Sequence, residues 1–438
     1  MLRVLLVALP VVLAGYALDD RGFAYLASVP GTPLFAGELI LLLGGVFVVL
    51  ATGYARAAFR THLPMTLLLA FVAWGLSRTL PLLPLYGIDS LRDAALWYYA
   101  LIAVLIATLV VAVPELPRRW ARWYLPFLVV LLLWSPVALL LSTSTTPTLP
   151  GGVPLFSHKP GNIAVAAATA VGFLWLVPNQ ALSRGARAML TAFATVVILA
   201  VGTQNRGGLV AALVALVLTG VLLGRRSANM AAVMIGTVLV GFVIGWGFDI
   251  HVSGSQGRDY SVAQLIQNAA STTGVQDSGN LGATVAFRDQ LWSGVITLAG
   301  EQGALPAGLG FGPNLAQQLG VSVGVSDPLR SPHNSHVDIL ARMGIVGMIL
   351  WVAFWGAWYA LMFRRTRATS PLISPEAKGL LKVCTVGVTA ILVNAYFDPT
   401  LESPPVAIWL WTLVGLGLGI AARSRAPKRR GTGVGAQL

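Results

Sequence analysis

The residues best suited to chemistry lie in one short segment, Ser331-Pro-His-Asn-Ser-His-Val-Asp338. Two of the five histidines of the chain, His333 and His336, are three residues apart there, directly before a long apolar run. Imidazole titrates at about pH 6.5 and is the usual group for taking a proton from a hydroxyl. Three interpretations stay open: interfacial histidines capped by Asn334, a metal site of His333, His336 and Asp338, or a general base.

Two arginines form the second group of candidate functional residues. Arg206 stands in the short turn Thr203-Gln-Asn-Arg-Gly207 between two apolar runs, where an unpaired guanidinium is costly unless it faces a cavity or an anion. Arg288 lies in an amphipathic segment further along the chain. Because the planar guanidinium binds phosphate oxygens in pairs, both arginines indicate an anion site. The alternatives are a snorkelling Arg206 and an Arg288 on a solvated helix face.

Spacing alone does not rank the other charged candidates. Glu38, near the end of the second apolar run, is expected to be a counter-ion or an acid at the lipid interface. The remaining basic candidates are Arg78, Arg92, Lys159, Arg258, Arg330 and Arg342. The chain has no P-loop, dinucleotide fingerprint, HExxH helix or GxSxG elbow, so ATP-driven chemistry by this chain alone is not expected. Its single cysteine, Cys384, excludes an intramolecular disulfide framework and a thiolate metal cluster.

The elements that carry these residues are predicted to be membrane-spanning helices. Only 10% of the 438 residues are charged, against about 25% in ordinary soluble proteins, and 56% are hydrophobic. Since one span takes about 20 residues, we expect an all-α integral membrane protein with about twelve transmembrane helices. The apolar runs cover residues 2–17, 34–54, 64–83, 94–113, 123–142, 162–179, 188–203, 207–224, 229–248, 336–362, 379–396 and 404–422. The first run is alternatively a cleaved signal peptide.

The distribution of charge indicates how the chain is oriented. Most of the 29 Lys and Arg residues fall on one side of the predicted spans, and most of the 16 Asp and Glu residues fall on the other. The positive-inside rule then places both termini in the cytoplasm. Despite a net charge of +13, nucleic acid is not an expected partner, because the basic tail 423–438 suits a solvated or headgroup-bound anchor. His333, Arg206 and Arg288 all fall on the outer side, where positive charge is rare.

One connection on the outer side is far longer than the others. Residues 249–335 form this loop, and loops of such length are usually functional or disordered. Apolar and polar residues recur at helical spacing in Ser261–Ala270 and in Ala283–Leu298, which predicts amphipathic helices at the membrane interface. A Gly-rich segment, Gly308–Asn314, follows. The predicted organisation is nine spans in 1–248, the loop 249–335, three spans in 336–422 and the tail 423–438.

The order of these motifs resembles that of the O-antigen ligase and polymerase superfamily. His333-Asn334, nine residues and then Gly344-Ile-Val-Gly347 is similar to the His-Asn-x9-Gly-x-x-Gly pattern that follows a long periplasmic loop in that family. Gln204–Gly207 resembles the family's Ser-Arg-Gly turn, with asparagine where serine is more usual. The Arg288 segment, followed by Gly308–Asn314, is similar to the family's loop that leads into a Gly-x-Gly stretch. Together with the topology, the resemblance covers nearly the full length.

The resemblance implies a twelve-helix inner-membrane glycosyltransferase of the GT-C type, and within the family it favours an O-antigen ligase of the WaaL type. Such an enzyme transfers O-polysaccharide from undecaprenyl diphosphate to a sugar hydroxyl of lipid A core in lipopolysaccharide biosynthesis, without a nucleotide sugar, a cofactor or a required metal. His333 would be the general base, and Arg206 and Arg288 would hold the diphosphate. A single displacement would invert the anomeric centre. Asn334 would cap the following helix, and His336 would orient His333 or border the acceptor.

Two other kinds of function stay open. An O-antigen polymerase or a protein O-oligosaccharyltransferase would use the same donor and a similar histidine, but a single long loop and no large appended domain favour the ligase. A lipid-linked glycan transporter would be expected to carry polar residues in the middle of its spans. Nearly all charges in this sequence lie at span ends, which disfavours transport.

Overall fold

The computed structural model describes residues 1–29, 32, 34–142, 146–149, 152–178, 182–254, 258–272, 280–321, 330–367 and 373–423. These residues are almost entirely helical, which confirms the expected class of a helical integral membrane protein. A two-stranded antiparallel hairpin, β1 (Val252–Ser253) and β2 (Asp259–Tyr260), pairs Val252 with Tyr260.

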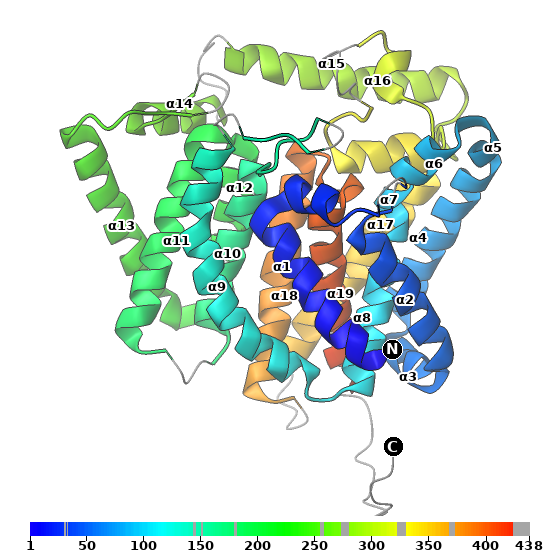
Figure 1. Ribbon diagram of the computed structural model, residues 1–438, viewed down its shortest axis with the longest axis horizontal. Coiled ribbons are helices and arrows are strands. Elements are labelled where there is room, and N and C mark those ends of the chain that lie inside the picture. Colours follow the sequence, from blue (N-terminus) through cyan, green and yellow to red (C-terminus); the bar gives the residue numbers. More distant parts are fainter. Residues whose placement is uncertain are drawn as a thin grey trace, which may run out of the picture.

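The helices form one apolar bundle and a smaller group that covers one of its ends (Figure 1). The bundle contains α1 (Leu2–Leu26), α2 (Ala36–Leu50), α3 (Thr52–Ala58), η1 (Phe59–Thr61), α4 (Leu63–Thr79), η2 (Leu80–Leu82), α5 (Leu83–Tyr86), α6 (Ile88–Asp93), α7 (Ala95–Tyr98), α8 (Leu101–Ala112), α9 (Leu116–Leu141), α10 (Pro160–Leu176), α11 (Arg184–Gln204), α12 (Arg206–Leu223), η3 (Gly224–Arg226), α13 (Ser227–Gly247), α17 (Ser335–Arg367), α18 (Pro375–Phe397), η5 (Thr400–Glu402) and α19 (Pro404–Arg423). The covering group is α14 (Val262–Thr272), α15 (Asn280–Glu301) and α16 (Leu315–Gln318). We call the covered end the capped face.

By length and composition, the described chain has fewer candidate membrane spans than the twelve expected. Eight helices of the described chain are long and apolar enough to cross a membrane, or up to ten if each of two bent pairs is one span. The expected run 34–54 is such a pair, because α2 and α3 meet at an angle of 98°. One of these eight is the 42-residue stretch Arg206–Gly247. It turns back at Gly224, since Gly241 of α13 packs beside Leu199 of α11.

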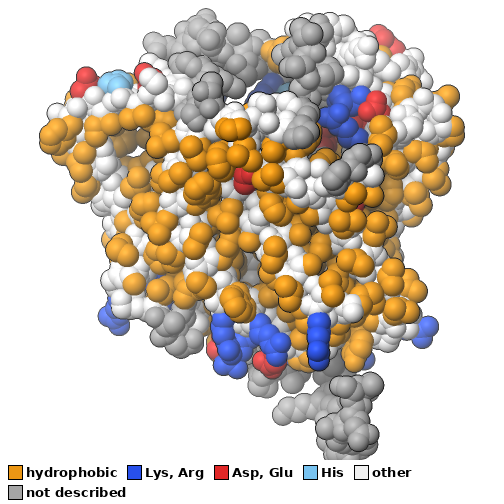
Figure 2. Space-filling model, in the orientation of Figure 1, with side chains coloured by type: hydrophobic (Ala, Val, Ile, Leu, Met, Phe, Trp, Pro, Cys, Tyr) orange, Lys and Arg blue, Asp and Glu red, His pale blue; other side chains and the backbone are white. Residues whose placement is uncertain are grey.

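The core of the bundle lies around α8, α10, α18 and α19, whose side chains are mostly buried. Aromatic side chains fill its centre, where the indole of Trp355 stacks on Trp411 with 5.8 Å between ring centroids. On the visible outer face, hydrophobic side chains form a broad belt, and Lys and Arg gather at the rim opposite the capped face (Figure 2). This distribution of side chains suits a protein surrounded by lipid.

The covering helices occupy the two stretches that were expected to be amphipathic. α14 extends the stretch Ser261–Ala270 by two residues, and α15 begins before Ala283 and ends beyond Leu298. Both lie across the ends of the bundle helices, not alongside them (Figure 1). The capped face is therefore where any site under the long loop must lie.

The first helix is longer than expected and is broken at a buried acid. α1 continues past residue 17 to Leu26, and Asp20 has φ +41° and ψ −114° inside it. The Asp20 carboxylate accepts hydrogen bonds from the Lys159 backbone N–H at 3.1 Å and from Asn162 Nδ2 at 2.8 Å. These contacts stabilise a conformation that is unfavourable for a residue with a side chain. The break thereby joins α1 to the start of α10.

Candidate active site

His333 occupies a tight turn directly before α17, on the capped face. Asn334 ends the turn by accepting hydrogen bonds at its Oδ1 from the N–H groups of His336 at 2.9 Å and Val337 at 3.2 Å, as a helix N-cap does. His333 itself has φ +52°, a strained value that is typical of functional turns. Within the described chain its half-buried ring forms no hydrogen bond. Its nitrogens are therefore available to a substrate.

The second histidine of the motif faces the interior of the bundle. His336 Nε2 lies 2.9 Å from the Leu392 carbonyl oxygen, and its Nδ1 accepts a hydrogen bond from Trp351 Nε1 at 3.2 Å. Since Nδ1 accepts, the ring proton is on Nε2, which donates to Leu392. Both ring nitrogens are thus used in helix packing, and His336 holds α17 against α18.

Glu38 is likewise engaged inside the protein. Its carboxylate accepts hydrogen bonds from the Phe35 N–H and from the Tyr98 hydroxyl, each at 3.0 Å, and from the Tyr99 hydroxyl. Glu38 is the third residue of α2, so the Phe35 contact is a capping interaction that fixes the start of that helix. These contacts anchor α2 to the segment that precedes α8.

Three arginines converge at the capped face. Arg206 is the first residue of α12, directly after the N-cap Asn205, whose Oδ1 accepts a hydrogen bond from Gly208 N–H at 2.7 Å. Arg258 reaches the same place and donates from Nη1 to the Gln204 carbonyl oxygen at 2.6 Å. Arg206 is within electrostatic reach of both Arg258 and Arg288. Like charges gathered at the positive end of a helix make a site for an anion.

Arg288 is the arginine with the most freedom to bind a ligand. It comes from α15, and among the described residues its guanidinium has no hydrogen-bond or ion-pair partner. Burial lowers the pKa of this guanidinium, Asp398 raises it and Arg258 lowers it further. Burying a charged guanidinium costs free energy unless an opposite charge compensates it. The surroundings of Arg288 therefore favour the binding of an anion.

An ion pair between two distant segments links His333 to the rest of the site. Lys159 Nζ, just before α10, lies 2.8 Å from Asp398 Oδ1, just after α18. Burial lowers the pKa of His333; the Asp398 charge opposes this effect, and the Lys159 and Arg288 charges add to it. The His333 imidazole is therefore neutral at pH 7 and able to accept a proton. The Asp398 charge would stabilise a protonated His333.

Trp292 fastens the covering helix α15 to the His333 turn. Its Nε1 donates a hydrogen bond of 2.7 Å to the carbonyl oxygen of Pro332, the residue before His333. Its ring packs edge-on against Tyr396 of α18, with 5.3 Å between centroids. Trp292 follows Arg288 by four residues, so both side chains lie on the same face of α15. The same face of α15 therefore carries Arg288 and contacts the turn that holds His333.

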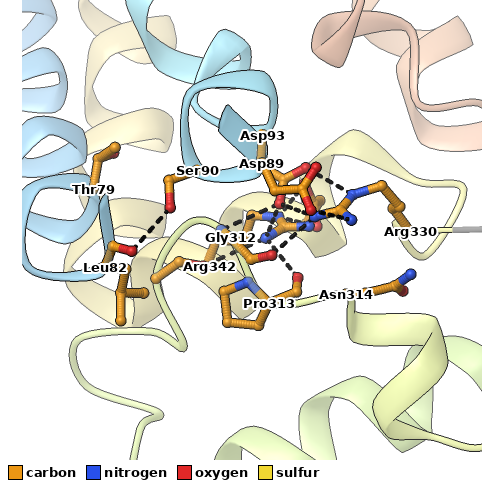
Figure 3. Close-up of polar contacts among 12 residues, drawn as sticks. Thr79, Leu82, Asp89, Ser90, Asp93, Gly312, Pro313, Asn314, Arg330 and Arg342 are labelled. Carbon is orange, nitrogen blue, oxygen red and sulfur yellow. Dashed lines mark hydrogen bonds and ion pairs between the residues drawn. The ribbon is translucent and has the colours of Figure 1, made fainter. Parts of the chain in front are cut away.

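Two further arginines named as candidates belong to a buried ion-pair network (Figure 3). Arg330 bridges Asp89 and Asp93, with both N···O distances at 3.1 Å. Arg342 lies 3.1 Å from Asp93 and 3.0 Å from Asp338. Since these guanidinium groups are paired with carboxylates, they hold the loop before α17 to α6 and do not face an anion.

The Gly-rich segment also has a structural role. Its N–H groups are used by the protein, because Leu309 donates to the Ala341 carbonyl at 2.7 Å and Gly310 to the Arg342 carbonyl at 3.0 Å. Gly308 has φ +83°, and a Cβ there would lie 2.2 Å from the Arg342 carbonyl oxygen. Only glycine allows this approach to the bend of α17 at Gly344. Arg78 holds the same segment from α4, by a 3.0 Å hydrogen bond to the Gly308 carbonyl.

The metal-site interpretation of His333, His336 and Asp338 is not supported. In the ranges that the structure describes, no three His, Cys, Asp or Glu side chains gather closely enough to hold a metal ion. Asp338 is paired with Arg342, and both nitrogens of His336 have protein partners. His333 is thus the histidine of the motif that faces the site.

The part of the chain that contains the arginines and His333 matches a known protein family. The model of the O-antigen ligase family matches residues 190–352. This region is therefore similar to the O-antigen ligase family. The match confirms the resemblance inferred from the motifs, and it contains Arg206, Arg258, Arg288 and His333. No curated protein matches the chain.

The residues matched by the family model do not contain the whole site. Lys159 and Asp398 lie outside the matched residues, on segments that flank them. Lys159 and Arg258 were among the basic residues that spacing in the sequence does not rank. Asp398 and Trp292 were not predicted from the sequence. Asp398-Pro399 after an apolar run is a sequence signal for the acid, and Trp292 lies within the stretch Ala283–Leu298, which indicates only an amphipathic helix.

Proposed function

We propose that this protein is an O-antigen ligase, which transfers O-polysaccharide from undecaprenyl diphosphate to a sugar hydroxyl of lipid A core. The observation that carries the proposal is that Arg206, Arg258 and Arg288 gather at the same end of the apolar bundle as His333, a histidine whose pKa is lowered by burial. A cationic site for a diphosphate and a base for a hydroxyl are the two groups that this transfer needs. The match of residues 190–352 to the O-antigen ligase family supports the same class of reaction.

In the proposed reaction, His333 takes the proton of the acceptor hydroxyl as its oxygen attacks the anomeric carbon of the donor. The new bond joins the acceptor oxygen to that carbon, and the bond between the carbon and the diphosphate oxygen breaks. Undecaprenyl diphosphate leaves with the bonding electrons, and Arg206 and Arg288 stabilise its negative charge. Asp398 stabilises the His333 imidazolium. One displacement inverts the anomeric centre, and the leaving group needs neither a strong acid nor a metal.

The proposed setting is the bacterial inner membrane, with the capped face toward the periplasm and both termini in the cytoplasm. The apolar belt of the bundle and the Lys and Arg at the opposite rim support this orientation (Figure 2). The fold is proposed to be of the GT-C type with twelve spans. Donor and acceptor lipids would then reach His333 from the outer leaflet, beneath α14 and α15.

Reconstitution with defined substrates tests the proposed function. The purified protein is incubated in liposomes with undecaprenyl-diphosphate-linked O-polysaccharide and lipid A core, with and without EDTA, and the product is read as a ladder on a gel. A ladder on lipid A core that survives EDTA is expected. If the donor is instead joined to a second donor or to a protein, the assignment changes to a polymerase or a protein O-oligosaccharyltransferase. A donor that is never consumed by folded protein would contradict transferase activity altogether.

A further inference from the structure

A cavity lies inside the apolar bundle, between α1, α9, α10, α18 and α19. Its volume is about 80 Å³. The walls are mainly apolar and aromatic, with Phe127, Ala166, Trp409 and Leu413 among them. Several of these side chains are only half-buried, so the cavity is not sealed within the protein core.

The size and walls of the cavity restrict what it can hold. Pockets that enclose drug-sized ligands have roughly 300–1,000 Å³, so this cavity is too narrow for a sugar or a diphosphate. Two of its polar lining groups are occupied by the protein: Asp20 accepts two hydrogen bonds, and Trp409 Nε1 donates to the Leu13 carbonyl at 2.9 Å. An apolar chain suits such walls, because it buries its surface without leaving polar groups unpaired.

The polar end of the cavity connects to the candidate active site through a short series of contacts. Asp20 lines the cavity and accepts the hydrogen bond from the Lys159 N–H. The Lys159 ammonium is paired with Asp398, which acts electrostatically on His333. A lipid whose chain enters the cavity therefore has its polar part near His333.

The same arrangement separates the cavity from the arginines. Asn162, Ala166 and Thr169 of α10 line the cavity. The other face of α10 packs on α12, where a Cβ on Gly208 would meet Gly161 Cα at 2.6 Å. Since Arg206 begins α12, α10 stands between the cavity and the arginine that would bind the diphosphate.

Charge also distinguishes the two lipids of the proposed reaction. Asp20 lines the cavity, and no Lys or Arg side chain of the described chain does. A diphosphate would therefore find no cationic partner in this lining, whereas Arg206 on the far side of α10 attracts it together with Arg258 and Arg288. An inverting displacement needs the acceptor and the leaving diphosphate on opposite sides of the anomeric carbon.

We propose that this cavity receives an apolar chain of the lipid acceptor and so positions the acceptor hydroxyl at His333. The proposal rests on the proposed function, and it assigns the two lipids to different sides of α10. The donor chain runs on the arginine side, and the acceptor chain enters between α1, α9 and α19.

Filling the cavity tests the proposal by steady-state kinetics. Ala166→Leu and Ala166→Phe add increasing bulk at a half-buried position of the wall, and Val196→Phe is the matched control, because Val196 of α11 is 49% exposed. Ala166→Phe is expected to raise KM for lipid A core at least fivefold, with a smaller rise for Ala166→Leu. KM for the undecaprenyl diphosphate donor should stay unchanged in both, and the control should change neither. An unchanged acceptor KM in folded Ala166→Phe, or a rise in the donor KM alone, would overturn the proposal.

Photo-crosslinking tests the cavity without relying on turnover. Lipid A core with a diazirine in one acyl chain is irradiated with wild-type protein in nanodiscs, and the labelled peptides are mapped by mass spectrometry. Label is expected on the Phe127 and Thr169 peptides, reduced in Ala166→Phe and not displaced by undecaprenyl phosphate. Label confined to other helices would overturn the cavity assignment even if transfer is observed. Label in the cavity without transfer would leave the assignment standing and contradict the proposed function.

Discussion

Trp292 on the covering helix donates a hydrogen bond of 2.7 Å to the carbonyl oxygen of Pro332, next to His333. Arg288 lies one helical turn before Trp292 on the same face of α15. The positions of His333, the proposed base, and of Arg288, the proposed anion-binding residue, therefore depend on one contact between the long loop and the bundle.

Trp292→Phe should lower the rate of transfer while leaving the protein folded. The substitution keeps the ring packing on Tyr396 and removes the hydrogen bond, which contributes about 1 kcal/mol. We expect a fall of roughly fivefold in kcat with a smaller change in donor KM, measured with the reconstituted substrates. Trp123→Phe is the control, since Trp123 of α9 is 74% exposed. A Trp292→Phe variant with wild-type kcat would contradict the positioning role.

Arg288→Ala should weaken donor binding and transfer together. Each hydrogen bond to a charged group contributes about 1.5–3 kcal/mol, which corresponds to a loss of roughly tenfold to over a hundredfold in kcat/KM for the donor. Arg258→Ala is expected to show a smaller loss, because Arg258 already donates to the Gln204 carbonyl. Arg92→Ala provides a matched control on α6, where the side chain is exposed. Equal donor kcat/KM values in Arg288→Ala and the control would rule out the diphosphate role.

The rate of transfer should rise with pH as His333 loses its proton. This rising limb of the pH–rate profile should reflect the pKa of His333. Burial places the pKa of this imidazole below its ordinary value of about 6.5, so the neutral base predominates at pH 7. In Asp398→Asn the stabilising negative charge is lost and Lys159 keeps its positive charge, so the limb should move further to lower pH. The maximal rate should fall as well, because the imidazolium is less stable. Asp249→Asn, at an exposed site, is the control, and a limb that moves to higher pH in Asp398→Asn would contradict the assignment.

The buried network of Figure 3 should determine stability more than activity. Arg342→Met leaves Asp338 without its 3.0 Å partner in a fully buried site, which destabilises proteins by about 3–5 kcal/mol. The double variant Arg342→Met with Asp338→Leu should recover most of this loss, because the unpaired Asp338 carboxylate is gone and Asp93 keeps Arg330 as its partner. Unfolding in detergent micelles measures both. A single variant as stable as the wild type would show that the pair is not needed for folding.

The sequence was most informative where one property extends over a whole element. Each of the twelve expected apolar runs overlaps a helix or a bent pair of helices, because burial in lipid requires long uninterrupted hydrophobic stretches. The amphipathic pattern of the long loop likewise indicated α14 and α15. The breaks were not predictable in this way: the kink at Asp20 depends on hydrogen bonds from Lys159 and Asn162, about 140 residues away.

The candidate site was predictable in its residue types and less so in its pairings. His333 and Arg288 stood out because histidine and outward-facing arginine are rare in this chain. Asp398 and Lys159 are 239 positions apart, and no local spacing shows that they form an ion pair. The difference between His333 and His336 was also hidden, since it depends on Leu392 and Trp351 taking both nitrogens of the second ring.

The most direct test of the central claim separates donor binding from proton transfer at His333. His333→Ala and His336→Ala are compared with the wild type in two assays. The first measures binding of undecaprenyl-diphosphate-linked O-polysaccharide to the protein, and the second measures formation of the ladder on lipid A core in the presence of EDTA. We predict that His333→Ala retains the donor and forms no ladder, while His336→Ala, once shown to be folded, still forms one. A ladder at the wild-type rate from His333→Ala would contradict the account, because the base assigned to the acceptor hydroxyl would then not be needed.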